Sequence, residues 1–155
     1  MQIFKKRSFL TIIMMEFVGF AFTKIYAERF FENTDKSKIE TSLNLTSIEE
    51  IFPKADSKKD SILKVSFKYE INYSEGVAKI EIQGNLFISL EKSFAEEILK
   101  KWEKKNLSDS FKLPVFNTIM HKSNIKSLQI EDELGLLPHF QLPSLSLSKK
   151  DELHN

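Results

Sequence analysis

The stretch that decides the fold is Leu63-Lys-Val-Ser-Phe-Lys-Tyr-Glu-Ile-Asn-Tyr73, in which every second side chain is apolar. The residues between them are all polar, so the alternation has no exception over its whole length. Successive side chains of a β-strand point to opposite faces of the sheet. The pattern therefore predicts a strand with one buried face and one face in water.

A second strand follows at once. Ser74-Glu75-Gly76 predicts a turn, and the alternation restarts at Ala78 and continues to Ile88. Two such runs around a short turn predict an antiparallel hairpin. Gly84 falls on the apolar face of the second run, which indicates a bulge or the close approach of another backbone.

Two more strands are predicted upstream of this hairpin. Residues 17–31 are rich in aromatic and β-branched side chains, and we expect a strand there with a bulge near Ile25-Tyr26. Residues 36–51 alternate more weakly and predict a second strand. The polar, lysine-rich residues 52–60 predict a loop that leads into the hairpin.

The period changes from two to about four after Leu90. Phe94, Ile98 and Trp102 recur every four residues and predict an amphipathic helix. Residues 106–112 are expected to break it. A second helix is then predicted with Pro114 in its first turn, with room for a kink or break at Asn124 and with Gly135 as its stop.

The segment after Gly135 cannot continue the helix. It is Leu136-Leu-Pro-His-Phe-Gln-Leu-Pro143, and its two prolines predict an extended apolar arm. Residues 16–147 are therefore expected to form one α+β domain, with a four-stranded curved antiparallel sheet followed by two helices and an extended C-terminal arm. Residues 148–155 are expected to form a frayed tail.

Residues 1–15 form an N-terminal lead with three possible explanations. Lys5, Lys6 and Arg7 precede a short apolar run, as in a signal peptide. The alternatives are a cytoplasmic amphipathic lead and an over-long gene start, with translation beginning at Met14 or Met15. The apolar span is shorter than the ~17–25 residues that cross a bilayer, and membrane association is not expected.

Composition excludes several function classes. The chain has no cysteine, which removes disulfides, thiol catalysis and thiolate metal sites. Its formal charge of +1 gives little steering toward nucleic acid, and DNA binding is not expected. Only three histidines are present, widely spaced, so neither a metal nor another cofactor is expected.

No motif predicts an enzyme, because the phosphate-binding, dinucleotide-binding, zinc-protease and serine-hydrolase signatures are all missing. Glu131-Asp132-Glu133 is the densest acidic run, and we expect it to be a solvated helix end. His139 lies between Pro138 and Phe140 and is expected to be an exposed loop imidazole. The alternatives for His139 are a partner contact and a pH-sensitive latch.

Phenylalanine is unusually frequent, with 14 residues against one tryptophan and three tyrosines. Most of these rings are expected in the core, but some are expected to face a groove. The arm adds apolar side chains outside any periodic element, and these must cover the domain, meet a second copy or border a binding groove. The candidate client or partner contacts are Leu137, Phe140, Leu142 and Phe116.

The segment Phe20-Ala-Phe-Thr-Lys-Ile-Tyr-Ala-Glu-Arg-Phe30 resembles the first strand of SecB-type export chaperones. The order of four strands and two helices is similar too, and so is the ending Gly135-Leu-Leu-Pro-His-Phe-Gln-Leu-Pro143. That ending also resembles a set of short archaeal proteins of undefined function. The resemblance implies a cytoplasmic chaperone that holds unfolded or partner polypeptides in apolar grooves, as a homodimer or a dimer of dimers.

The charges on the polar face of the predicted sheet differ from those of SecB-type chaperones. SecB-type chaperones dock the SecA motor on an acidic patch, whereas the predicted polar face here carries Lys64, Lys68 and Lys79 against Glu70 and Glu81. The family's acidic, glycine-rich tail is also missing. Docking to the motor is therefore left open.

The basic residues support a different class of function. A ribosome-associated homodimeric dormancy or assembly factor would contact small-subunit RNA or proteins through a basic sheet face. The lysines that would contact phosphates are Lys64, Lys68, Lys100, Lys101, Lys104 and Lys105.

Overall fold

A computed structural model of the chain describes residues 15–32, 38–51 and 60–146. The strands are β1 (Glu16–Arg29), β2 (Ile39–Ile51), β3 (Asp60–Tyr73) and β4 (Ala78–Glu91), and the helices are α2 (Lys92–Glu103) and α3 (Asp109–Leu134). A short 3₁₀ turn, η1 (Ser74–Gly76), joins β3 to β4. The predicted α+β class, with four strands followed by two helices, is confirmed.

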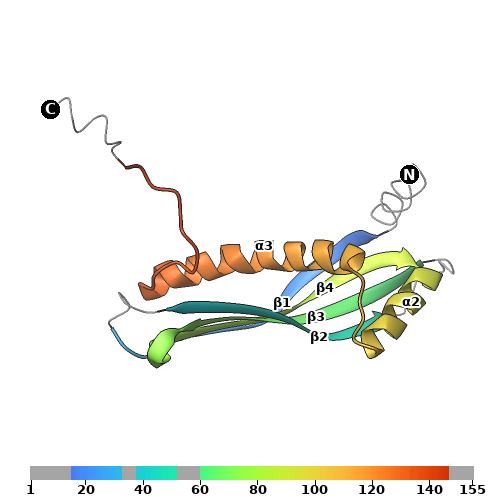
Figure 1. The fold of residues 1–155 in the computed structure, drawn as a ribbon, viewed down its shortest axis with the longest axis horizontal. Helices are drawn as coiled ribbons and strands as arrows, with labels where there is room; N and C mark the ends of the chain where they lie inside the picture. Colours follow the sequence, from blue (N-terminus) through green and yellow to red (C-terminus); the bar gives the residue numbers. More distant parts are fainter. Residues whose placement is uncertain (1–14, 33–37, 52–59, 147–155) are drawn as a thin grey trace.

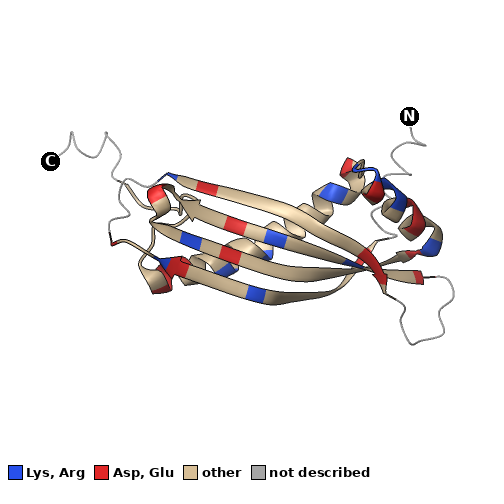
Figure 2. Ribbon diagram, turned by 90° about the horizontal axis from the view of Figure 1, so that it is seen from below, with Lys and Arg blue, Asp and Glu red and all other residues tan. Residues whose placement is uncertain are grey.

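The four strands form one antiparallel sheet in the order β1-β4-β3-β2. β1 therefore joins the sheet beside the last strand, and β1 and β2 form its two edges. α3 runs along one face of the curved sheet, and α2 lies at the end where β4 finishes (Figure 1). No described helix covers the opposite face, which carries rows of charged residues (Figure 2).

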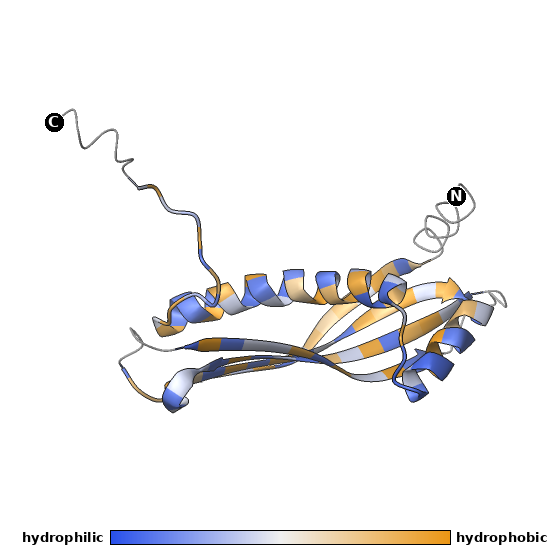
Figure 3. Ribbon diagram, viewed as in Figure 1, coloured by the Kyte–Doolittle hydropathy of each residue, from blue (hydrophilic) through white to orange (hydrophobic). Residues whose placement is uncertain are grey.

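The predicted hairpin of β3 and β4 forms the centre of the sheet. Alternate residues of both strands face α3 and are almost fully buried, with Phe67 only 1% exposed. The turn residues Glu75 and Gly76 have φ values of 60° and 67°, which reverse the chain within three residues. Figure 3 shows the resulting concentration of apolar residues along the strands, whereas α3 mixes polar and apolar turns.

β1 is bulged in two places, between Phe17 and Gly19 and between Phe22 and Lys24. The predicted bulge near Ile25-Tyr26 is wrong, because these two residues pair regularly with Ile82 and Glu81. The direction of the side chains explains why the extra residue follows Phe22. An extra residue after Phe22 keeps the apolar side chains before and after it on the helix-facing side of the sheet.

Gly84 confirms the close approach expected from its position. A Cβ atom on Gly84 would lie 2.5 Å from the carbonyl oxygen of Ala21 and 2.7 Å from the ring of Phe67. Both distances are far below van der Waals contact, so β1 and the Phe67 ring occupy the space that a side chain would need.

Both predicted helices are present, but the start of α3 differs from the prediction. α2 buries Ala95 and Ile98. α3 begins at Asp109, before the turn predicted at Pro114, because Phe111, Val115 and Ile119 recur every four residues on its buried face. Pro114 removes one hydrogen bond to an early carbonyl, and the burial of these side chains outweighs that loss.

α3 is continuous through Asn124, so the kink considered there does not occur. It ends at Gly135 as predicted, with the left-handed φ of 64° that glycine adopts most easily. Residues 1–14, 52–59 and 147–155 lie outside the described ranges. The N-terminal lead, most of the predicted loop and the frayed tail, and with them the predicted domain bounds, therefore stay predictions.

The approach at Gly84 gives a stability test. Gly84→Ala should lower the free energy of unfolding by about 1–3 kcal/mol, the usual cost of overpacking. Gly19→Ala is the matched control, because its Cβ would meet only the movable Phe87 ring at 3.2 Å. We expect it to change stability by less than about 0.5 kcal/mol. If chemical denaturation shows that Gly84→Ala and Gly19→Ala change the free energy of unfolding equally, the packing described at Gly84 is contradicted.

Candidate functional site

A groove runs between β1 and α3 on the helix-covered side of the sheet. One hollow of about 360 Å³ is lined by Phe20, Phe22, Lys122, Ile125, Lys126 and Gln129. A second of about 350 Å³ shares Phe20 and Lys122 and extends past Phe17 and Thr118. The two hollows share these two lining residues, and together they are called the β1–α3 groove below.

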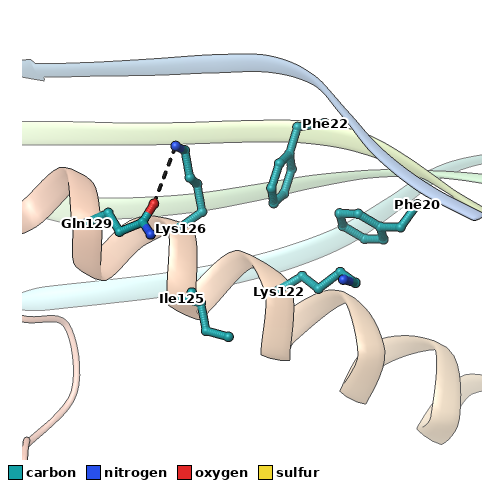
Figure 4. A pocket seen from close by; sticks show the side chains of 6 residues that line it. All are labelled: Phe20, Phe22, Lys122, Ile125, Lys126 and Gln129. Atoms are coloured by element: carbon teal, nitrogen blue, oxygen red, sulfur yellow. Dashed lines mark hydrogen bonds between the residues drawn. The ribbon is translucent and has the colours of Figure 1, made fainter.

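The strand wall of this groove is aromatic. Phe20 and Phe22 pair with Leu86 and Gly84 of β4, which places their side chains on the core face. The Phe20 ring stacks on Phe67 with centroids 5.6 Å apart, and the Phe22 ring meets the Phe20 ring edge-on at 5.1 Å. Both residues are only half-buried. Figure 4 shows the two rings on the strand and the helix side chains across from them.

The helix wall is polar and cationic. Lys122 Nζ lies 5.3 Å from the centroid of the Phe20 ring, a cation–π distance. One turn further on, Lys126 Nζ lies 3.5 Å from Gln129 Oε1. Ile125 lies between these lysines and is 49% exposed. The groove therefore has an apolar strand side and a basic helix side.

Arg29 ties the end of β1 to the end of α3. Its Nη1 donates to the carbonyl oxygens of Leu134 at 2.9 Å and Gly135 at 3.2 Å. These carbonyls are left without partners where a helix ends, and an arginine there satisfies them. The tie fixes the C-terminal turn of α3 relative to β1.

A buried polar cluster anchors the arm on the other side of α3. The His139 side chain is 4% exposed, with Nδ1 against Glu131 Oε1 and Nε2 at 3.0 Å from Asn124 Oδ1. Tyr69 donates to the same Asn124 oxygen at 2.6 Å. Tyr73 Oη lies 2.8 Å from Glu131 Oε2 and 2.5 Å from the carbonyl oxygen of Leu137. The cluster therefore connects β3, α3 and the arm.

The protonation of the tyrosines fits their role as donors. Burial and the Glu131 charge raise the pKa of Tyr69 to about 12. Burial and the hydrogen bond to Glu131 also raise the pKa of Tyr73 well above its ordinary value. Both hydroxyls keep their protons at neutral pH. Each hydroxyl can therefore donate its one proton to an acceptor that faces it.

Two sequence expectations are wrong in this cluster. Glu131 is fully buried and not part of a solvated helix end, although Asp132 and Glu133 are exposed. His139 is not an exposed loop imidazole. The physical reason is the chain reversal at Gly135, which returns the arm to α3 and brings His139 back to the glutamate eight residues before it.

The arm contacts predicted from the sequence lie apart from the groove. Leu137, Phe140 and Leu142 are 40%, 41% and 45% exposed, while Phe116 is half-buried in α3. None of the four lines the described hollows. Asn124 and Glu131 hold the arm, whereas Lys122 and Lys126 line the groove. At 3.6 residues per turn, these two pairs of positions fall on opposite sides of α3.

The lysines proposed to contact phosphates are largely paired where they lie on the sheet. Lys64 lies 3.3 Å from Glu49, and Lys68 lies 2.6 Å from Glu70 and 3.2 Å from Glu81. Hydrogen bonds from Lys24 and then Lys68 lower the pKa of Glu81 and keep it ionised. The polar face of the sheet is therefore internally neutralised.

The remaining lysines of that set lie around the end of α2. Lys101 pairs with Glu97 at 2.9 Å, while Lys100, Lys104 and Lys105 are exposed. In the described ranges, no three histidine, aspartate or glutamate side chains are grouped so as to hold a metal ion. No described helix is long and apolar enough to cross a membrane.

The arrangement of these elements defines a fold class. The sheet is ordered β1-β4-β3-β2 and is covered on one face by a long helix that follows a short one, and this fold is similar to that of a solved SecB-like chaperone. The Mycobacterium tuberculosis Rv1957 SecB-like chaperone, solved in complex with a ChAD peptide from the Rv1956 HigA1 antitoxin, matches with a TM-score of 0.55. The match covers 92% of this chain and 97% of that chain at 9% identity.

The likeness therefore concerns the fold, and it confirms the SecB-like architecture expected from the sequence. No protein-family model matches the chain, and no curated protein matches it either.

The arm anchor can be tested through stability. His139→Ala should lower the free energy of unfolding by about 3 kcal/mol, because it removes the side chain that faces the buried Glu131 carboxyl group and leaves that polar group without this partner. Adding Glu131→Gln to that variant should restore part of the loss, since the amide carries no charge. His121→Ala, on the exposed side of the same helix, is the control. If His139→Ala lowers the free energy of unfolding by as little as His121→Ala does, the proposed anchoring of the arm is contradicted.

Proposed function

We propose that the protein is a non-enzymatic, SecB-like chaperone that holds extended segments of unfolded or partner polypeptides in the β1–α3 groove. The observation that carries this proposal is the aromatic wall of β1, which α3 leaves uncovered. Apolar rings exposed in a groove are costly in water and are covered favourably by apolar side chains of a ligand.

The shape of the groove favours a polypeptide over a small molecule. The groove is open to solvent and follows the direction of a strand past Phe17, Phe20 and Phe22. An extended chain advances about 3.3 Å per residue and turns alternate side chains to the same side. Such a chain can therefore place an apolar side chain against each ring in turn.

The fold comparison supports the same class of ligand. The Rv1957 chaperone, whose fold is similar, was solved with a peptide bound. A homodimer or dimer of dimers and a cytoplasmic location belong to this proposal, as does the lack of a cofactor. The ribosome hypothesis gains no support from the described residues, because its sheet lysines are paired with carboxylates.

Ile125→Asp tests the groove directly. This exposed side chain lines the groove, so a carboxylate there should weaken retention of a reduced, alkylated, permanently unfolded test protein by about tenfold, or 1.4 kcal/mol. The melting temperature should change little, because the residue is on the surface.

Leu113→Asp is the matched control. Leu113 is 61% exposed on the same helix and does not line the described groove hollows. We expect it to retain the test protein as the wild type does. Equal binding by both variants, measured by fluorescence anisotropy, would refute the groove as the client site.

We also propose that the arm contacts clients or partners through Leu137, Phe140 and Leu142. These side chains are exposed although the arm is anchored by His139, which lies beside Phe140 with ring centroids 4.8 Å apart. A long client that leaves the groove could extend over α3 to reach this second apolar surface. Half-buried Phe116 lies in α3 about two turns before Asn124, the residue that His139 of the arm contacts.

Phe140→Asp tests the arm separately. Binding of the unfolded test protein should weaken several-fold, while the melting temperature should shift by no more than a few degrees, because the ring is 41% exposed. Gln141→Asp adds the same charge next to it and serves as the control. A large loss of stability with unchanged binding would make Phe140 a packing residue.

A further inference from the structure

We propose that the β1–α3 groove selects polypeptide segments in which acidic residues alternate with aromatic or large aliphatic ones. This inference rests on the proposed function, since it names the class of segment that the groove holds. The features that carry it are the absence of carboxylates facing the groove in the described residues and the spacing of two lysines along it.

Among the described residues, the charges that face the groove are all positive. Between Asp109 and Glu131, α3 contains no acidic residue, and its groove side carries Lys122 and Lys126. The acidic residues of β1 are Glu16 and Glu28, which are in register with Ser89 and Lys79 on the polar face of the sheet. A client carboxylate in the groove would therefore meet cations and no like charge from the described residues.

The two lysines have no carboxylate partner among the described residues. Lys122 lies over the Phe20 ring, and the polar neighbour of Lys126 is the uncharged Gln129. Five other described lysines do form ion pairs, namely Lys24, Lys38, Lys64, Lys68 and Lys101. The groove lysines therefore remain available to a ligand anion.

The spacing of the lysines matches an extended chain. Lys122 and Lys126 are four residues apart on a helix, which is about 6 Å along its axis. Alternate residues of an extended peptide are about 6.6 Å apart and point to the same side. Acidic side chains at two alternate positions can thus face the two lysines. The residue between them points to the opposite side, toward Phe20 and Phe22.

The expected preference is moderate and sensitive to salt. Exposed ion pairs are individually weak, and charges near a surface are screened over about 10 Å at 0.1 M salt. Two attractive pairs replaced by two repulsive ones should change affinity by about tenfold at low salt, and the difference should shrink at high salt.

The experiment compares three labelled peptides with the same alternating phenylalanine and leucine residues. Their other positions are glutamate, glutamine or lysine. By fluorescence anisotropy, the wild-type protein should bind the glutamate peptide about tenfold more tightly than the lysine peptide, with the glutamine peptide between them. Lys122→Glu with Lys126→Glu should reverse this order. The control, Lys100→Glu with Lys104→Glu, makes the same charge change outside the groove and should preserve the order.

Other results would overturn the inference in distinguishable ways. Equal binding of the three peptides, with the unfolded test protein still retained, would refute the acidic preference and leave the proposed function standing. If the wild-type protein binds neither the peptides nor the unfolded test protein, the proposed function is refuted as well. A third result is that no peptide binds, while the variant with Lys122→Glu and Lys126→Glu differs from the wild type in its mass by light scattering. In that case the groove is occupied by a second copy of the chain.

Discussion

Three phenylalanine rings gather where β4 lacks a side chain, and the rest of the structure depends on that contact. Gly84 leaves room for the Phe67 ring above it and for the backbone of β1 beside it. Phe20 stacks on Phe67, and Phe22 packs against Phe20. Because β1 closes against β4 here, its aromatic side chains have one side in the core and the other side directed outward. The groove wall is therefore a direct extension of the core.

The helix does not cover this wall because its position is fixed elsewhere. α3 turns small side chains, Ser123 and Ser127, toward the sheet, and these are fully buried. Its last turn is then held from two sides. Arg29 binds its terminal carbonyls from β1, and Tyr73 with His139 binds Glu131 from β3 and the arm. A helix fixed in this way cannot slide across β1 to bury the rings, so the open groove is a consequence of the packing.

The sequence predicts the parts of the fold that depend on local periodicity. The uninterrupted alternation of Leu63 to Tyr73 gives the central hairpin, and the four-residue spacing of Phe94, Ile98 and Trp102 gives α2. The pairing of β1 with β4 is beyond such patterns, because it joins residues about sixty positions apart and depends on packing at Gly84. For the same reason, no local pattern places Lys122 opposite Phe20. Glu131 looks solvated in a run of three acids, and only the returning arm buries it.

The central claim is that an extended polypeptide occupies the groove between β1 and α3. Amide hydrogen exchange of the full chain, with and without a saturating unfolded test protein, measures this most directly. We expect slower exchange in residues 16–22 and 118–129 and unchanged exchange in β2, the edge strand on the far side of the sheet. Protection confined to β2 or to the polar face of the sheet, with none in β1 and α3, would contradict the claim.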